Sequence, residues 1–170
     1  VSCWEGRGAD LVGIGKQIVR DKVNAAWLTS ALFQAAVDGV PGLFETLQII
    51  LTGGDVVSAE HVRRIQERCP GLVVVNGYGP TENTVFTACE VIAPGSLQGR
   101  DAVSIGRPIG GTTVQIVDQH GHRVAPGRIG ELVAGGEGVA LGYVAGDPEG
   151  RFKADGASRF YRTGDLARWA

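Results

Sequence analysis

The sequence predicts an α/β fold, in which a parallel α/β layer is followed by a small β-rich, barrel-like lobe. In the first hundred residues, short apolar stretches rich in β-forming residues alternate with helical periodicity, a pattern typical of βαβ units and a parallel sheet. From residue 104 onward, short β-rich pieces are separated by Gly- and Pro-containing turns, and no helical period persists. We therefore predict two subdomains, residues 1–103 and 104–170, with a linker at 93–102.

Three segments of the first subdomain have helical features. The first has Leu11, Ile14 and Ile18 at helical spacing, the second is rich in helix-forming residues, and the third begins at Ser58, a suitable N-cap. The predicted helices span residues 9–22, 30–37 and 58–68.

Apolar stretches with β-forming residues are predicted to be strands. In the first subdomain they are residues 23–28, 47–51 and 72–75, and in the second they are 113–117, 131–133, 139–143 and 160–161.

The charge and cysteine content narrows the function classes. The 16 basic and 18 acidic residues give a net charge of −2, which disfavours binding to a nucleic acid backbone. No apolar run is long enough to cross a bilayer, so no membrane partner is expected. Three cysteines without a CxxC spacing fit a reducing, cytoplasmic environment. Because the chain contains no methionine, even at position 1, we expect it to be an excised piece of a longer protein.

The loop NGYGPTENT at 76–84 is the most informative motif. It follows a predicted parallel strand, and ligands of open α/β sheets collect at the carboxyl ends of strands. Tyr78 offers a flat aromatic face, Thr81 a hydroxyl for a phosphate oxygen, and Glu82 a carboxylate for a cation such as Mg²⁺. A plain Gly-Pro turn with a surface glutamate explains the same residues about as well.

Two other loops carry a glycine followed by an acid. The first, LTGGD at 51–55, also follows an apolar strand, so two loops would face one crevice. The second, within YRTGDLARW at 161–169, is predicted to be a turn that presents Asp165, whose carboxylate could accept two hydrogen bonds from a ribose diol. Taken singly, the first loop is also explained as a simple turn, and the second is better explained as a turn that Asp165 caps.

Three further candidates are interpreted as structural. The GIGK string at 13–16 lacks the full phosphate-loop spacing and lies within a predicted helix. His120 and His122, with Asp118, are expected to form a hairpin turn rather than a metal site. The charged residues of 63–68 are interpreted as a solvated helix face.

Four segments in order resemble the signatures of adenylate-forming enzymes. They are NGYGPTENT, IGRPI at 105–109, GELVAGGEGVALGY at 130–143 and YRTGDLARW. The details are most similar to the amino-acid-activating adenylation domains of nonribosomal peptide synthetases. The resemblance covers nearly the whole chain and implies the central part of the large N-terminal domain of such an enzyme.

The resemblance implies roles for individual residues. Tyr78 would stack on adenine, Asp165 would hold both ribose hydroxyls, Thr81 would bind the α-phosphate, and Glu82 would ligate Mg²⁺. Gly54, Asn76 and Gly77 would also border the nucleotide. The parent would use ATP and Mg²⁺ to form an aminoacyl-adenylate and then load a phosphopantetheine thiol. Its partners would be the peptidyl carrier and condensation domains of the synthetase.

The resemblance also implies a substrate pocket that is apolar throughout. Because it holds no charge, a charged side chain would lose its hydration without gaining a partner. The pattern favours a compact aliphatic amino acid, valine first, with isoleucine and leucine as competitors because one methylene discriminates by only ~1–3 kcal/mol. The pocket residues are Trp27, Leu51, Gly53, Gly77, Val85 and Phe86.

Two alternatives remain open. One is an acyl-CoA or aryl-acid ligase of the same superfamily, and the other is a non-catalytic, excised or engineered specificity subdomain. The family's early phosphate loop and its C-terminal lysine have no counterpart in the sequence. We therefore expect the isolated chain to be inactive or nearly so.

Overall fold

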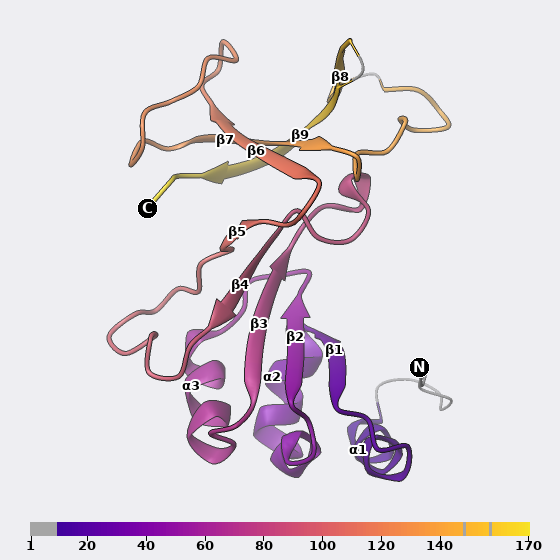
Figure 1. Ribbon diagram of the computed structural model, residues 1–170, viewed down its shortest axis with the longest axis vertical. Helices are drawn as coiled ribbons and strands as arrows, with labels where there is room; N and C mark the ends of the chain where they lie inside the picture. The colour runs from indigo at the N-terminus through magenta and orange to yellow at the C-terminus, as the bar shows by residue number, and fades with distance from the viewer. Residues whose placement is uncertain (1–9, 148, 157) are drawn as a thin grey trace. The chain divides into compact units, whose positions relative to one another are not determined.

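Each of two units in the chain is built around its own β-sheet (Figure 1). The computed structural model describes residues 10–147, 149–156 and 158–170. One unit comprises the chain up to Gly77 together with Cys89–Gly106, and the other comprises Tyr78–Ala88 and Arg107–Ala170. The predicted division between residues 103 and 104 differs from these units in two places: Tyr78–Ala88 belongs to the second unit, and residues 104–106 belong to the first.

The sheet of the first unit contains the predicted parallel layer. Its strands lie in the order β1 (Ala25–Thr29), β2 (Ile49–Gly53), β3 (Val73–Tyr78) and β4 (Ala88–Ile92). The pairs β1–β2 and β2–β3 are parallel, which confirms the βαβ prediction. The sequence prediction missed β4.

The three predicted helices are confirmed, each with a side-chain cap. They are α1 (Leu11–Arg20), α2 (Ser30–Gly39) and α3 (Ala59–Arg68), and a 3₁₀ helix, η1 (Pro41–Phe44), follows α2. Ser58 caps α3 as expected, with its hydroxyl oxygen 3.4 Å from the His61 N–H. Thr29 both ends β1 and caps α2, so the chain turns from strand into helix without a loop. The GIGK string lies within α1.

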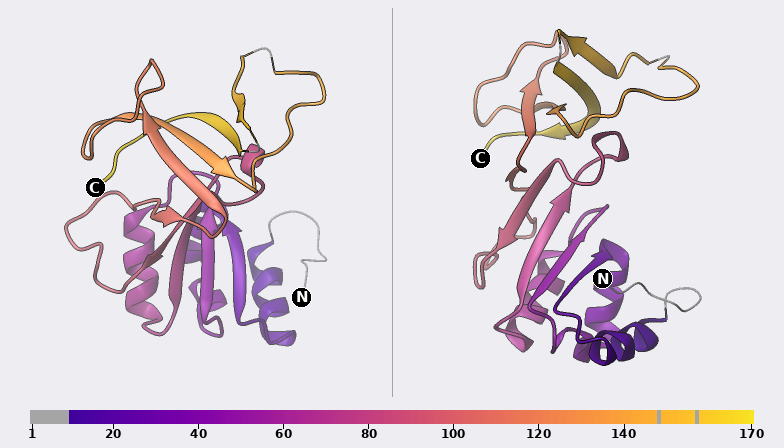
Figure 2. Two further views of the ribbon diagram at one scale, coloured as in Figure 1. Left: turned by 45° about the horizontal axis from the view of Figure 1, so that its top comes forward. Right: turned by 45° about the vertical axis from the view of Figure 1, so that its right-hand side comes forward.

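The core of this unit lies between α2, α3 and one face of the sheet (Figure 2). Ile50 and Val74 point from neighbouring strands toward Val62 and Phe33 of the helices, and all four side chains are fully buried. Phe33 meets Phe44 edge-on, with ring centroids 5.8 Å apart. The opposite face is less covered: Ile49 and Val73 there, next to each other in register, are about two-fifths exposed.

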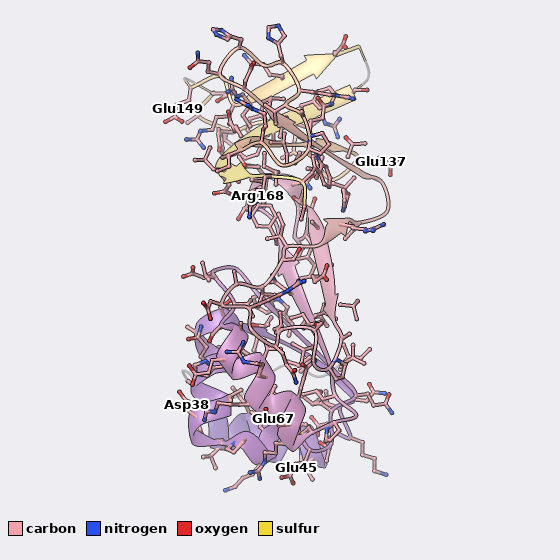
Figure 3. All side chains as sticks on the ribbon, turned by 90° about the vertical axis from the view of Figure 1, so that its left-hand side faces the viewer. Asp38, Glu45, Glu67, Glu137, Glu149 and Arg168 are labelled. Atoms are coloured by element: carbon pink, nitrogen blue, oxygen red, sulfur yellow. The ribbon has the colours of Figure 1, made fainter. Side chains whose placement is uncertain are left out.

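Figure 3 shows the charged side chains at the surface around α3, with Glu67 of that helix labelled together with Asp38 and Glu45. Some of the charged side chains of α3 bind other groups of the unit and are not only solvated. Arg64 pairs with Asp38 at 2.7 Å, a contact that contributes little to stability because both side chains are exposed. Arg63 departs from the prediction, because its guanidinium donates to the carbonyls of Leu97 and Arg100 at 3.0 and 2.7 Å. It thereby fastens the segment that follows β4 to α3.

The second unit contains a four-stranded antiparallel sheet in the order β6-β7-β9-β8, which confirms the predicted β-rich lobe. The strands of this sheet are β6 (Thr112–Val117), β7 (Gly130–Gly136), β8 (Phe152–Asp155) and β9 (Ser158–Ala167). The short strand β5 (Arg107–Pro108) precedes them in the chain and is not part of this sheet. The hairpin turn predicted at Asp118 is confirmed, because the Asp118 N–H donates to the His122 carbonyl at 2.9 Å. Among the described residues, no helix is long and apolar enough to traverse a membrane.

The strand predicted at 139–143 is wrong. This segment is a loop, and the Ala140 N–H donates to the Glu82 carbonyl at 2.8 Å instead of to a strand. Gly142 within it has φ +144°. The predicted turn at Asp165 is also wrong, because that residue lies inside β9, in an interruption of the strand pairing.

Candidate functional site

The candidate site begins where β3 ends and the NGYGPTENT loop continues the chain. Asn76 is buried, and its side-chain amide donates to the Ser104 carbonyl at 2.9 Å, so it anchors the strand end. Gly79 follows at a point where an added Cβ would lie 2.6 Å from the Thr87 nitrogen. The loop therefore doubles back on itself so closely that only glycine fits at 79.

Tyr78 and Asp165 contact each other directly within the second unit. The Tyr78 hydroxyl donates a hydrogen bond to Asp165 Oδ2. Burial, reinforced by this contact, raises the pKa of the Tyr78 phenol above its usual range, so the phenol keeps its proton at neutral pH. Asp165 itself is exposed, so its carboxylate can still meet a ligand.

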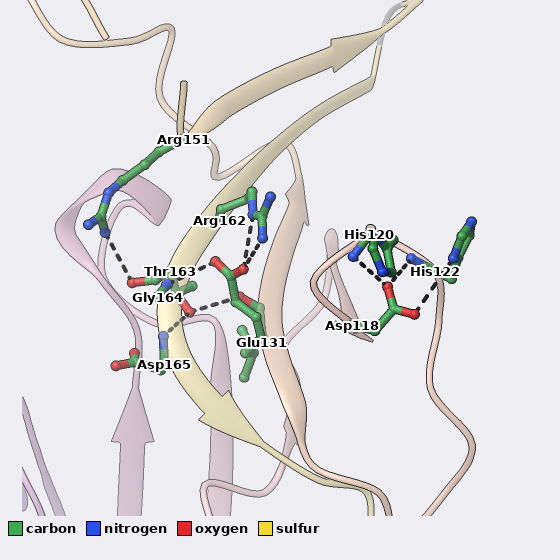
Figure 4. A network of polar contacts seen from close by, with 10 residues as sticks. Asp118, His120, His122, Glu131, Arg151, Arg162, Thr163, Gly164 and Asp165 are labelled. Atoms are coloured by element: carbon green, nitrogen blue, oxygen red, sulfur yellow. Dashed lines mark hydrogen bonds and ion pairs between the residues drawn. The ribbon is translucent and has the colours of Figure 1, made fainter. Parts of the chain in front are cut away.

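A bulge in β9 presents Asp165 (Figure 4). The pairing of β7 with β9 shifts register between Glu131 and Val133, and Gly164 in the bulge has φ +80°. The Asp165 N–H donates to Thr163 Oγ1 at 3.0 Å, and the Gly164 N–H donates to Glu131 Oε1 at 3.2 Å. The aspartate is thus held by a strand rather than by a free turn.

Glu131 links the bulge to the sheet. Its carboxylate pairs with Arg162 of β9 while also accepting the Gly164 N–H. The Arg162 hydrogen bonds lower the pKa of the Glu131 carboxyl, so the pair is ionised at neutral pH. Figure 4 also shows the Asp118 turn, in which Asp118 Oδ1 accepts the backbone N–H groups of His120 and His122 at 2.8 and 2.9 Å.

Glu82 lies in a short 3₁₀ helix, η2 (Thr81–Asn83), that follows Pro80. Its Oε1 accepts a 2.6 Å hydrogen bond from the Tyr143 hydroxyl. That bond is the main cause of a lowered pKa for the Glu82 carboxyl, which is therefore an anion at neutral pH. Thr81 beside it is exposed, so its hydroxyl is accessible to a ligand.

Thr84 is a strained residue at the end of this loop. It has φ +70°, which a β-branched residue rarely adopts. Its hydroxyl donates to the Gly138 carbonyl at 2.8 Å, and its N–H donates to the Thr81 carbonyl at 3.0 Å. Such strain persists only where the surroundings hold it, and it gathers at functional sites.

Four of the six predicted pocket residues lie on the less covered face of the first sheet. Trp27 pairs in register with Leu51, and Gly53 pairs with Gly77 two residues further along the strands. Side chains two residues apart on a strand share a face. The other two pocket residues, Val85 and Phe86, belong to the second unit.

Gly53 and Gly54, near this face, require glycine for different physical reasons. A Cβ on Gly53 would lie 2.0 Å from the Gly77 carbonyl oxygen, so no side chain fits there. Gly54 has open space around it but a φ of +81°, which glycine adopts at little cost.

The sequence prediction overlooked Tyr143, Tyr161 and Thr84. Tyr143 and Tyr161 lie within the motifs GELVAGGEGVALGY and YRTGDLARW, yet nothing in their spacing shows that both approach Glu82. The left-handed backbone of Thr84 carries no sequence signal, because threonine is not a residue type that favours it.

Comparison with known proteins identifies the family. Residues 9–144 match the model of the AMP-binding enzyme family. Among curated proteins, gramicidin S synthase 2 of Brevibacillus brevis is 37% identical over 95% of the chain, and tyrocidine synthase 3 of Brevibacillus parabrevis is 37% identical over 94%. The chain spans 4% and 2% of the length of these two relatives.

Solved structures agree with the sequence relatives. PA1221, described as an NRPS protein containing adenylation and PCP domains, is 43% identical with a TM-score of 0.84, and the match covers 93% of this chain and 33% of that one. The Klebsiella oxytoca NpsA N-terminal subdomain, in complex with 3-hydroxybenzoyl-AMSN, is 27% identical with a TM-score of 0.80, covering 94% and 42%. The chain belongs to the AMP-binding enzyme family. Within it, the chain corresponds to part of the adenylation domain of nonribosomal peptide synthetases.

Proposed function

We propose that the chain carries the nucleotide- and metal-binding part of an enzyme that activates an amino acid with ATP, releasing pyrophosphate and forming an aminoacyl-adenylate. One observation carries the proposal. Tyr78 and Asp165, far apart in the sequence, meet in one unit, and Thr81 and Glu82 belong to the same unit. The gramicidin and tyrocidine synthase relatives and the adenylation–PCP structure support the same activity.

Each residue has a role that suits this chemistry. Tyr78 offers its ring to adenine, the exposed Asp165 accepts hydrogen bonds from the ribose hydroxyls, and Thr81 donates to an α-phosphate oxygen. An amino-acid carboxylate is already ionised at pH 7, so it attacks the α-phosphorus without a general base, and pyrophosphate leaves. The chain's contribution is therefore to position the reactants and to balance their charge.

The donor set fits Mg²⁺ held together with a nucleotide. Glu82 is an ionised, partly exposed carboxylate, and Mg²⁺ prefers such oxygen ligands. Across the described ranges, no group of three or more His, Cys, Asp or Glu side chains could hold a metal by itself. An ion at Glu82 would therefore take its other ligands from phosphates and water. Bound there, it would neutralise the phosphate charge.

We infer that the substrate side chain is aliphatic, with valine as the first candidate. Trp27, Leu51, Gly53 and Gly77 share one sheet face and carry no charge, which supports an apolar contact surface. Trp27 contributes volume, whereas Gly53 and Gly77 leave only backbone.

The aminoacyl group would then pass to a phosphopantetheine thiol on a peptidyl carrier domain. The solved structure that combines adenylation and PCP domains supports a carrier as partner, and a condensation domain would receive the loaded carrier. An aryl-acid ligase of the same superfamily is the second candidate. The NpsA subdomain in complex with 3-hydroxybenzoyl-AMSN favours it.

Calorimetric titration with non-hydrolysable adenylate analogues tests the proposal. Valyl, leucyl, aspartyl and 3-hydroxybenzoyl analogues are compared on the wild-type chain and on Asp165→Asn. We expect saturable binding that is tightest for valyl and weaker in Asp165→Asn. Equal binding of all four would refute the pocket assignment alone, and tightest binding of the aryl analogue would favour the second candidate. No binding of any analogue to a chain that melts cooperatively would refute the nucleotide site in this chain.

The prediction that the chain by itself is inactive needs a separate assay. Amino-acid-dependent exchange of pyrophosphate into ATP measures reversible adenylate formation. We expect none above a no-enzyme control, and sustained exchange with valine would overturn that expectation.

A further inference from the structure

Direct hydrogen bonds join the NGYGPTENT loop at 76–84, which contains Glu82, to the loop that follows β7. The Glu82 carbonyl accepts the Ala140 N–H at 2.8 Å, and the Thr84 hydroxyl donates to the Gly138 carbonyl at 2.8 Å. These contacts explain why residues 139–143 form a loop rather than a strand. They also bring Tyr143, at the end of that loop, beside the Glu82 side chain.

The hydrogen-bond chain at Glu82 has a single direction. The ionised Glu82 carboxylate can only accept hydrogen bonds, so the Tyr143 hydroxyl donates its one proton to Glu82 Oε1, at 2.6 Å. The Tyr143 and Tyr161 oxygens lie 3.1 Å apart, so Tyr161 must be the donor to Tyr143. The chain therefore runs from Tyr161 through Tyr143 to Glu82, an arrangement in which each bond strengthens the next.

The aromatic rings keep this chain in place. Phe152 of β8 meets Tyr143 edge-on, with centroids 5.1 Å apart, and lies tilted against Tyr161 at 4.9 Å. Phe152 and Tyr161 are register partners in the sheet, and Tyr161 is only 3% exposed. Tyr161 is thus held by the sheet, whereas Tyr143 lies in a loop and is held by the Phe152 ring and by its hydrogen bond to Glu82 Oε1.

We propose that Tyr143 is a positioning residue that orients the Glu82 carboxylate for a divalent cation, with Tyr161 behind it. This inference rests on the proposed function, because it takes Glu82 as a metal ligand. A carboxylate has more acceptor sites than one hydrogen bond uses, so Glu82 can accept from Tyr143 and still ligate a cation. Outer hydrogen bonds of this kind orient metal ligands, and their loss costs about 10–100-fold in metal affinity.

Mn²⁺ binding to the full 170-residue chain, measured by electron paramagnetic resonance with saturating ATP, tests the proposal. The compared proteins are wild type, Tyr143→Phe, Glu82→Gln and the double variant, with Glu90→Gln of the first unit as a matched control. Tyr143→Phe keeps the ring on Phe152 and removes only the hydroxyl. We expect about tenfold weaker Mn²⁺ binding in Tyr143→Phe. Glu90→Gln should match wild type.

The double variant separates positioning from general structural damage. If Tyr143 acts through Glu82, Tyr143→Phe causes no further loss in the Glu82→Gln background. Mn²⁺ binding that is lost in Glu82→Gln but unchanged in Tyr143→Phe would overturn this inference and leave the proposed function intact. Equal losses from Tyr143→Phe in both backgrounds would overturn it as well. Mn²⁺ binding that does not depend on Glu82 would overturn the proposed metal role and the inference together.

Discussion

The Tyr78 hydroxyl donates to the Asp165 carboxylate although the two residues lie 87 positions apart in the chain. One residue ends a strand of the parallel sheet, and the other lies in a bulge of an antiparallel strand. Under the proposed function, the contact couples the ring that would stack on the base with the carboxylate that would bind the ribose. If Tyr78 and Asp165 act together, substitutions at Tyr78 and in the bulge that holds Asp165 should both weaken nucleotide binding.

Tyr78→Phe keeps the aromatic ring but removes the hydrogen bond to Asp165. We expect adenylate-analogue affinity to fall about threefold to tenfold, which is less than the roughly 1.5–3 kcal/mol that a hydrogen bond to a charged group contributes, because this bond acts on the ligand only through the orientation of Asp165. Tyr78→Ala should lose more, because base stacking is worth about 1–3 kcal/mol in addition. Calorimetry measures both. Identical affinity for wild type and Tyr78→Phe would show that Asp165 needs no orientation by Tyr78.

Gly164→Ala places a side chain where φ is +80°. We expect a loss of about 1–2 kcal/mol in the free energy of unfolding, together with weaker binding of the ribose, because the bulge that presents Asp165 must shift. Gly39→Ala is the matched control, since a Cβ there meets nothing and the backbone is not left-handed. Denaturant unfolding compares the two, and equal stabilities would contradict the role of the bulge.

Gly53→Ala should be more damaging than Gly164→Ala. The added Cβ would meet the Gly77 carbonyl oxygen at 2.0 Å, and backbone atoms of paired strands cannot move away cheaply. We expect a loss of about 2 kcal/mol or more in thermal or denaturant unfolding. Gly71→Ala, where a Cβ meets nothing, serves as control and should stay within about 0.5 kcal/mol of wild type.

The Glu131–Arg162 pair predicts a pH dependence of stability. The pKa of Glu131 is lowered in the folded chain, so its stabilisation is fully present above the ordinary value of 4.5 and is lost as the pH falls through the folded value. At pH 7, Glu131→Gln should cost about 1 kcal/mol, because the pair is partly solvated. The difference should shrink below pH 4.5. A stability difference between wild type and Glu131→Gln, measured by thermal unfolding, that stays constant down to about pH 3 would contradict this prediction.

Much of the fold was predictable because its elements have local causes. The helices carry caps such as Ser58 that interact within three residues, and the buried strands are continuous apolar runs. The wrong strand at 139–143 has a non-local cause. Its apolar run resembles a strand, yet the Ala140 N–H is taken by Glu82, which lies far earlier in the chain.

The sequence alone also singled out several residues of the candidate site. Tyr78, Glu82 and Asp165 stood out because glycine-rich loops surround them and because their motifs resemble a family. The hydroxyls of Tyr143 and Tyr161 reach Glu82 only through pairing of β8 with β9 and through the hydrogen-bonded loop after β7. Such contacts depend on register and backbone path, which the apolar pattern of single segments does not specify.

In the proposed substrate pocket, the close approach of Gly53 to Gly77 limits which positions can be changed to alter selectivity. A substitution at 53 disrupts the sheet before it reshapes any contact with a ligand, so selection or design cannot explore side chains there. Trp27, about half exposed, and Leu51, half-buried beside it, can vary without moving the backbone. Libraries aimed at a new substrate should therefore diversify positions 27 and 51 and leave 53 untouched.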